Sequence, residues 1–316
     1  MSTLQIDAPL ASLRRQMGTL DGARRSHPVL GMDITLRGAA PADTPECGRI
    51  LYEAFASLAA SHGFPPDFAS VEVATENIGC LINHPGFFGV VAEHDGRIVG
   101  SNFLDERSTI LAVGPISVDP AAQDGKVGRA LMNAVLQRAA HRHAPGVRLL
   151  QIAYHNRSLS LYAKLGFRVR ESFAAMYGEP LGLAIPGYTV RAATNADEAA
   201  CNALCFRVHG HDRAGDLRDA LTEGSASVVE RLGRITGYTT GIGYFSHSTA
   251  ETNDDLQALI GAAEDFGRPG FVIPLGNTEL FRWCLAHGLN VFFVMNLMTI
   301  GLYQEPAGAF LASVGY

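Results

Sequence analysis

Residues 115–131 read PISVDPAAQDGKVGRAL, and residues 155–167 read HNRSLSLYAKLGF. The first stretch begins with β-branched residues and then meets Asp119 and Pro120, which end a strand. After Gly128, apolar residues recur at the three- and four-residue spacing that is typical of a helix. The unpaired N–H groups and the positive dipole end of a helix start attract anions. The stretch therefore predicts a strand, a glycine turn and a helix that together hold a phosphate.

A Gly-x-x-Gly turn before a helix can also be no more than a tight connection, so the second stretch is needed to decide. Residues 149–153, LLQIA, are typical of a buried strand. A helix is expected from Asn156 through Tyr162, with Gly166 ending it. A strand, an Asn, a Tyr-bearing helix and then LGF form a far more specific series than the glycines alone.

In these residues the chain resembles the GNAT superfamily of acyl-CoA-dependent N-acyltransferases, whose hallmark is Gln/Arg-x-x-Gly-x-Gly/Ala at a strand-to-helix turn. Gln123 and Gly128 match this pattern. The resemblance is strongest over residues 88–176, and it implies acyl-CoA binding with the pantetheine along the strand edge. The residues it implies for acetyl-CoA are Ile116, Ser117, Val118, Gln123, Asp124, Gly125, Lys126, Val127, Gly128, Arg129 and Asn156.

Lys126 departs from the pattern, because it occupies the inner glycine position. Its backbone N–H can still donate and its ammonium can face a phosphate, but its Cβ takes room that glycine would leave free. Gly125, one residue earlier, is expected to relax the turn instead.

Tyr162 is the expected general acid. When an amine attacks a thioester directly, a thiolate leaves, and a phenol with a pKa of about 10 still carries its proton at neutral pH. By its place in the motif Tyr162 is expected to protonate the departing sulfur; the alternative is a buried helix Tyr. Asn156 is expected to bind the pantetheine or orient the turn, and a plain N-cap is the alternative.

Glu106 is the expected general base, since it lies near the end of the strand-like IVGSNFL segment. The neighbouring Asp105 and the more distant His155 are the other candidates. A solvated strand end is the competing interpretation of both acids.

The chain also repeats itself, which indicates two copies of one fold. Residues 35–47 and 189–201 share the same spacings from Arg to Asp and from Arg to Cys. VVAEHDGRIVG at 90–100 is echoed by VVERLGRITG at 228–237. Asn156 and Tyr162 are echoed by Asn277 and Trp283, again six residues apart.

The second copy lacks the chemical parts of the first. A strand is expected at TTGIGYF, residues 239–245, and the ten residues after it, SHSTAETNDD, hold no glycine. Glu251, Asp254 and Asp255 would satisfy a helix dipole themselves and repel CoA. Trp283 offers no titratable hydroxyl. We expect this copy to support structure or substrate selection without binding acyl-CoA in the usual way.

The expected fold class is α/β (α+β), with two tandem GNAT folds that each contain a mixed, mostly antiparallel central sheet flanked by helices. A length of 316 residues with 47% hydrophobic residues suits two cores. The expected bounds are an N-terminal arm at 1–30, an acyl-CoA-binding first copy at 31–180 and a degenerate second copy at 186–316. The Gly- and Pro-rich segment at 178–187 joins the copies.

Composition excludes several partners. A net charge of −6 without a basic stripe argues against nucleic acid, and no segment predicts a membrane span or a signal peptide, so a cytoplasmic protein is expected.

Five cysteines without a Cys-x-x-Cys pair indicate free thiols, and a cysteine nucleophile is the minor alternative. His209 and His211 favour a solvated or interdomain loop over a metal site, and no metal is expected.

Two functions remain. The first is an N-acetyltransferase that moves an acetyl group from acetyl-CoA to an amine of a small-molecule or amino-acid-like acceptor. The alternative is a catalytically weak or inactive CoA-binding sensor or interaction protein. Residues 60–87 are expected to contribute to the acceptor pocket. The sequence does not decide the oligomeric state, and a homodimer is one alternative.

Overall fold

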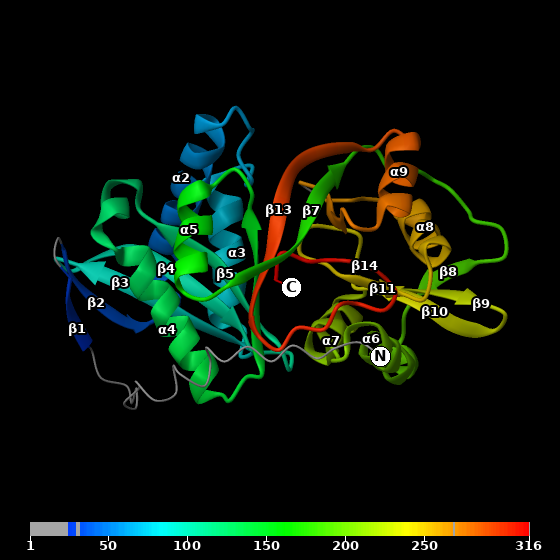
Figure 1. The fold of residues 1–316 in the computed structure, drawn as a ribbon, viewed down its shortest axis with the longest axis horizontal. Coiled ribbons are helices and arrows are strands. Elements are labelled where there is room, and N and C mark those ends of the chain that lie inside the picture. The colour runs from blue at the N-terminus through cyan, green and yellow to red at the C-terminus, as the bar shows by residue number, and fades with distance from the viewer. Residues whose placement is uncertain (1–24, 30–31, 268, 316) are drawn as a thin grey trace. The chain divides into compact units, whose positions relative to one another are not determined.

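The computed structural model describes residues 25–29, 32–267 and 269–315, and Figure 1 labels their elements. These residues form two compact units. The N-terminal unit comprises the described residues up to Glu106 together with Leu111–Val147, and the C-terminal unit comprises Arg107–Ile110 and the residues from Arg148 onward. Most of the expected N-terminal arm, residues 1–24 and 30, lies outside the described residues.

The N-terminal unit is built on an antiparallel sheet. Its strands are β1 (Arg25–Val29), β2 (Met32–Gly38), β3 (Phe87–His94), β4 (Arg97–Asp105) and β5 (Leu111–Val118), and they pair in chain order. Its helices are α2 (Thr44–Ser61), α3 (Val71–Asn83) and α4 (Val127–His141). Because β1 pairs with β2, the sheet extends N-terminally of the expected bound at residue 31.

Alternating side chains on β4 show which helices cover each face of this sheet. Phe103 packs in one apolar cluster with Cys47 and Leu51 of α2 and with residues of α3. The neighbouring Asn102 points to the other face, where its Nδ2 lies 3.5 Å from the Leu131 carbonyl of α4. Helices α2 and α3 therefore cover one face, and α4 covers the opposite one.

The C-terminal unit contains two groups of strands. One has the order β6-β13-β7-β12 and the other the order β14-β11-β10-β9-β8. The strands are β6 (Gly146–Ile152), β7 (Arg168–Tyr177), β8 (Thr189–Ala192), β9 (Ser227–Arg231), β10 (Arg234–Thr239), β11 (Ser248–Ala250), β12 (Phe271–Pro274), β13 (Asn290–Gly301) and β14 (Ala309–Leu311). The helices are α5 (Asn156–Lys164), α6 (Glu198–His209), α7 (Ala214–Glu223), α8 (Asn253–Ala262) and α9 (Thr278–Ala286). The expected class, mostly antiparallel sheets flanked by helices, is confirmed.

The two copies exchange strands in this unit. β13 belongs to the second copy by sequence, yet it lies between β6 and β7 of the first. Asn296 of β13 is paired with Ser172 of β7, and the Val294 carbonyl accepts from the Ala153 N–H that follows β6 (2.9 Å). On its other side, β7 pairs with β12 of the second copy. Strands of both copies therefore hydrogen-bond to each other within one sheet.

The repeat read in the sequence recurs as identical contacts. Arg37 donates to both carboxylate oxygens of Asp43 at 2.7 and 2.9 Å. Arg191 donates to both oxygens of Asp197 at 2.8 and 2.9 Å. Each Asp also accepts a backbone N–H at 2.8 Å, and this bond shapes the turn before α2 or α6. The tandem architecture is thus present in the side chains as well as the strands.

The prediction of a strand at residues 239–245 is wrong. β10 ends at Thr239, residues 240–247 form a loop, and the next strand is β11. Gly241 has a φ of 140°, and the loop closes when the Thr240 N–H donates to the His247 carbonyl at 2.9 Å. The glycines in TTGIGYF therefore turn the chain back on itself.

None of the helices in the described ranges is both long and apolar enough to cross a membrane.

Candidate functional site

The first half of the motif lies in the N-terminal unit, where a short 3₁₀ helix at Pro120–Gly125 links β5 to α4. Asp119 begins this connection, because its Oδ1 accepts the Ala121 N–H at 2.9 Å and its Oδ2 lies 3.2 Å from Arg49 Nη2. The connection ends at Lys126, whose φ of 61° is left-handed. The chain thus leaves β5 through a side-chain-capped turn and enters α4 through a single left-handed residue.

The left-handed position is Lys126, although Gly125 was expected to relax this turn. A Cβ at Gly125 would lie 2.4 Å from the Met32 sulfur, so a side chain at this position would require the flexible Met32 side chain to move. A left-handed backbone is strained for a residue with a Cβ, and lysine makes no local side-chain bond that would favour it. Lys126 therefore holds a conformation that glycine would adopt more readily.

The start of α4 is open to an anion. Lys126 is its N-cap residue, makes no side-chain cap hydrogen bond, and is followed by a first turn without an acidic residue. The first N–H groups of a helix have no partner inside the helix, and the positive dipole end lies there. Lys126 and Arg129 add two positive charges at this end. The turn thus has the donors and the charge that a phosphate requires.

The other residues expected at this turn and strand differ in exposure. Gln123 is exposed, Gly128 is partly exposed, Val127 is buried, and the side chain of Asp124 lies outside the described residues. On β5, Ser117 is buried opposite Ser101, whereas Ile116 and Val118 share the sheet face that α4 covers. The two apolar strand residues and the open helix start therefore belong to the same side of this sheet.

The second half of the motif lies in the C-terminal unit and begins at α5. The N-cap residue is His155, which makes no side-chain cap hydrogen bond, and Asn156 is the exposed first residue of the helix. Asn156 is therefore not the N-cap residue of α5, which was the alternative role considered for it from the sequence. In α9 of the second copy, Asn277 is the N-cap and its Oδ1 accepts the Leu280 N–H at 3.3 Å.

Tyr162 lies on α5 and is 7% exposed. Its ring packs at a tilt against Phe167, with 6.0 Å between the ring centroids. Burial raises the pKa of the Tyr162 hydroxyl above its usual range, because the phenolate would lose its hydration. The hydroxyl therefore keeps its proton throughout the neutral range, as a general acid requires.

Glu106 is bound at both carboxylate oxygens. Arg138 of α4 donates to them at 2.6 and 2.9 Å, and Arg142 Nε lies 3.8 Å away. This ion pair is mostly buried on the Glu side. A carboxylate in such a fork can accept a further proton only by weakening the pair. The role of Glu106 as a general base stays a prediction. The structure shows Glu106 in an ion pair with α4.

In the second copy, the start of α8 occupies the place that α4 occupies in the first, and it is closed. Asp255 accepts the Thr252 N–H at 3.0 Å and the Thr252 hydroxyl at 2.6 Å, and Thr252 Oγ1 accepts the Asp255 N–H in return. Thr236 donates to the other carboxylate oxygen. The protein's own carboxylate therefore fills the position of an anion, which supports the expectation that this copy does not bind acyl-CoA.

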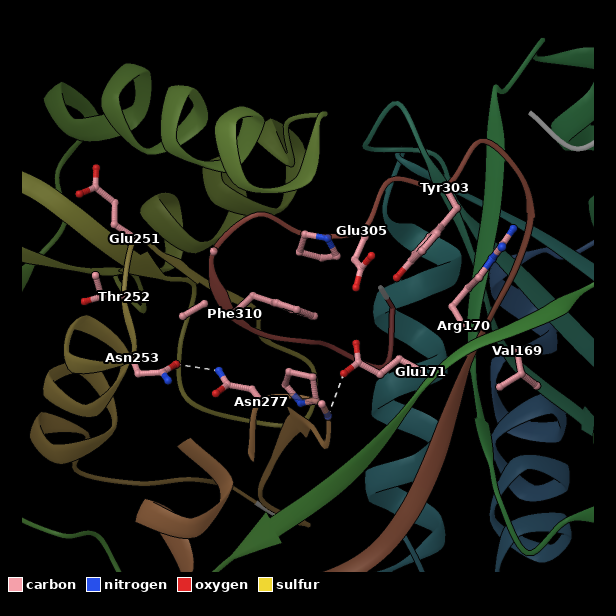
Figure 2. A pocket seen from close by; sticks show the side chains of 15 residues that line it. Val169, Arg170, Glu171, Glu251, Thr252, Asn253, Asn277, Tyr303, Glu305 and Phe310 are labelled. Carbon is pink, nitrogen blue, oxygen red and sulfur yellow. Dashed lines mark hydrogen bonds between the residues drawn. The ribbon is translucent and has the colours of Figure 1, made fainter. Parts of the chain in front are cut away.

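A pocket of about 1010 Å³ lies beside this closed helix start, and Figure 2 shows its lining. Glu171 of β7 and Glu305 point toward each other across it, and Glu171 accepts the Gly276 N–H at 3.0 Å. Burial raises the pKa of Glu171, and the charge of Glu305 adds to the shift. The pocket is acidic where phosphates would need cations. Its lining residues are Val169, Arg170, Glu171, Glu251, Thr252, Asn253, Pro274, Gly276, Asn277, Tyr303, Glu305, Pro306, Gly308, Ala309 and Phe310.

His209 and His211 are buried, which corrects the expectation of a solvated loop. Gly210, with a φ of 75°, ends α6, and His209 Nε2 lies 3.3 Å from Thr249 Oγ1. Burial, together with the positive charge of Arg148, lowers the pKa of His211 to about 3. Within the described residues, no group of three or more His, Cys, Asp or Glu side chains is arranged to hold a metal ion.

The buried cysteines are poor nucleophiles. Burial raises the pKa of Cys47 to about 11 and that of Cys201 to about 12. A thiolate is the reactive form of cysteine, so these thiols are inert at neutral pH.

Sequence reasoning missed a buried residue that supports the second half of the motif. Gln151 lies 2% exposed on β6, and its Nε2 donates to the His155 carbonyl at 3.0 Å and to Ser158 Oγ at 3.1 Å. A single amide within the apolar run LLQIA was the available signal, since a buried polar side chain must find partners. Thr252-x-x-Asp255 was likewise a readable capping signal.

Comparison with known proteins agrees with this geometry. Residues 85–169 match the family model described as an acetyltransferase (GNAT) domain. A protein of Pyrococcus horikoshii assigned as an acetyltransferase is 15% identical, with a TM-score of 0.70 over 93% of this chain and 99% of its own. A GCN5-related N-acetyltransferase of Sphaerobacter thermophilus is 18% identical, with a TM-score of 0.55 over 86% and 96%.

A tandem GNAT protein from the clavulanic acid biosynthesis pathway is also similar. It is 15% identical, with a TM-score of 0.50 over 87% of this chain and 99% of its own. None of the curated protein sequences matches this chain. These likenesses show a shared fold over most of the chain, including the tandem arrangement.

Replacing Lys126 with glycine should stabilise the protein, because glycine adopts the left-handed conformation without the clash of a Cβ. We expect K126G to raise the free energy of unfolding by up to about 1 kcal/mol. Urea denaturation followed by circular dichroism measures this difference. The matched control is K164G in the last turn of α5, where the same change should destabilise a helix by about 1 kcal/mol. Equal losses in both variants would contradict the strain at Lys126.

Proposed function

Because this chain carries a GNAT domain and is an acyltransferase of the tandem GNAT type, we propose that it moves an acetyl group from acetyl-CoA to an amine of a small-molecule or amino-acid-like acceptor. The amine attacks directly, without an acyl-enzyme. The observation that carries the proposal is the open, acid-free start of α4 next to Lys126 and Arg129. Its contrast with the closed start of α8 supports a single CoA site in the first copy.

The residues of the first copy fit the donor molecule. The backbone N–H groups at the start of α4 would hold the pyrophosphate, with the ammonium of Lys126 and the guanidinium of Arg129 beside it. Gln123 to Gly128 form the turn that leads the chain there. Ile116 to Val118 would carry the pantetheine, and Asn156 would contact it at the start of α5.

Acetyl-CoA supplies a thioester carbonyl that an amine nitrogen can attack. Tyr162 would give its hydroxyl proton to the sulfur as the carbon–sulfur bond breaks, so that a neutral thiol leaves. Burial keeps the Tyr162 hydroxyl protonated at neutral pH, and its raised pKa also makes it a weaker acid than a solvated phenol. The amine nitrogen loses one proton in forming the amide. Glu106 is the predicted acceptor of that proton, directly or through water.

A second candidate function is a CoA-binding sensor with weak or no turnover. The observation that favours it is the bidentate ion pair of Glu106 with Arg138. Both carboxylate oxygens of the predicted base already accept hydrogen bonds from Arg138. Tight acetyl-CoA binding without thiol release on any amine of a broad panel would establish this function in place of the enzyme.

Tyr162→Phe should slow the chemical step, since the phenol proton is then absent. We expect kcat to fall by at least about 100-fold, while the dissociation constant of acetyl-CoA changes little. Free-thiol release measures kcat, and titration calorimetry measures binding. Tyr177→Phe on β7, at an exposed tyrosine, is the matched control. Unchanged turnover in Tyr162→Phe would show that another group protonates the sulfur.

Arg129→Asp places a carboxylate at the third residue of α4, as Asp255 stands at the third residue of α8. The carboxylate should close the helix start, and acetyl-CoA affinity should fall by at least about tenfold. Arg129→Gln should produce a smaller loss, and Arg282→Asp on α9, which carries the same charge change, should produce none. An unchanged affinity in Arg129→Asp would place the pyrophosphate elsewhere.

Glu106→Gln separates the two roles of this carboxylate. If Glu106 is the base, kcat/KM should fall by about 100-fold at neutral pH and recover at alkaline pH, where the amine is already deprotonated. If the ion pair with Arg138 is its sole role, the melting temperature should fall and the shape of the pH profile should stay. Asp105→Asn changes the neighbouring carboxylate, the other acidic candidate, and a loss of kcat/KM in this variant alone would assign the base to Asp105.

A further inference from the structure

A directional chain of hydrogen bonds runs from β7 across β13 to the start of α5. Ser172 Oγ donates to Asn296 Oδ1 at 3.0 Å, and Asn296 Nδ2 donates to Gln151 Oε1 at 3.0 Å. Gln151 Nε2 then donates to the His155 carbonyl at 3.0 Å and to Ser158 Oγ at 3.1 Å. Strand β13 of the second copy thus reaches the helix of the first that bears Tyr162.

The direction of this chain is set at its end. The His155 carbonyl can only accept, so the Nε2 of Gln151 must face it and Oε1 must face Asn296. Asn296 must then donate through Nδ2, which leaves its Oδ1 for the Ser172 hydroxyl. Each amide has one orientation that satisfies all its partners. A carboxylate at position 296 could not donate to Gln151, although it has the same shape as the amide.

The contacts of Gln151 lie at the start of α5, where the N-cap residue provides no side-chain cap hydrogen bond. His155 makes no cap hydrogen bond, whereas Asn277 caps the equivalent helix α9. Ser158 Oγ also donates to the His155 carbonyl at 2.9 Å, so the two first-turn groups that accept from Gln151 are linked to each other; Gln151 Nε2 also contacts the Ile152 carbonyl at the end of β6. Asn156 lies in this turn, and Tyr162 follows within the same short helix. A shift of the turn therefore moves both.

We propose that Asn296 of the second copy and Gln151 of the first are positioning residues for the acetyl transfer, acting through the start of α5. The proposal rests on the proposed function, in which Tyr162 is the acid. It assigns the second copy a positioning part in the reaction: β13 supplies the amide that orients Gln151, and Gln151 orients the helix. The second copy then cannot be removed or replaced without loss of turnover.

Asn296→Asp tests the proposal with an isosteric change. The Gln151 amide should turn its Nε2 toward the new carboxylate and release the His155 carbonyl. We expect kcat for thiol release to fall by at least about tenfold while KM for acetyl-CoA changes less than about threefold, because misplacement affects the chemical step. Asn290→Asp is the matched control, since Asn290 is exposed at the start of the same strand and its Nδ2 donates to the Gly288 carbonyl. It should leave kcat unchanged.

Coupling to Tyr162 distinguishes positioning from a general loss of structure. In a Tyr162→Phe background, Asn296→Asp should lower kcat no further, because the group it positions is gone. An equal fold-loss in both backgrounds would overturn the proposal, as would wild-type kcat in Asn296→Asp. If Tyr162→Phe alone has wild-type turnover, the proposed acid fails, and a kcat loss in Asn296→Asp is then no longer explained through Tyr162.

Ser158→Ala keeps the proposal testable if Asn296→Asp does not fold. It removes the contacts of Ser158 Oγ with Gln151 and with the His155 carbonyl, and it leaves every strand residue in place. We expect a smaller fall in kcat than in Asn296→Asp, an unchanged KM, and the same lack of additivity with Tyr162→Phe. A folded Ser158→Ala protein with wild-type kcat would contradict the role of the Gln151 contacts.

Discussion

The insertion of β13 between β6 and β7 is the constraint on which the C-terminal unit depends. Buried backbone groups of strands need partners, and β7 finds them on β13 on one side and β12 on the other. Both of these partners come from the second copy. Neither copy can therefore complete its sheet by folding alone, and the repeat boundary in the sequence is not a boundary between independent sheets. This dependence also explains why compact units and sequence copies divide the chain differently.

The two copies differ most where their equivalent helices begin. α4 starts at a left-handed lysine without a cap bond, whereas α8 starts in a reciprocal cap between Thr252 and Asp255. The same contrast separates α5 from α9, whose Asn277 closes its own first turn. A capped helix start is stabilised by its own side chains and has fewer donors left for a ligand. The first copy leaves these donors open, and acetyl-CoA would use them.

Local patterns were readable because their causes lie within a few residues. The strand, turn and helix around Gly128, the helix from Asn156, and the Arg-to-Asp spacing of both copies all depend on neighbours in sequence. The features that the sequence did not predict depend on residues that lie far apart in the chain. Glu106 and Arg138 are 32 residues apart, and the burial of His211 follows from packing around the end of α6. Nothing in the local sequence of Gly125 shows that the Met32 side chain packs against it.

The sequence by itself determined the tandem GNAT architecture, the strand, turn and helix around Gly128, and the helix that carries Tyr162. These follow from residue types at fixed spacings, which dictate backbone conformation and helix ends. Only the tertiary structure decided which strand lies beside which, and hence that Asn296 contacts Gln151 across 145 residues. Strand order depends on the pairing of whole strands, and either copy could satisfy the local pattern. The partners of a buried amide are therefore fixed by the fold.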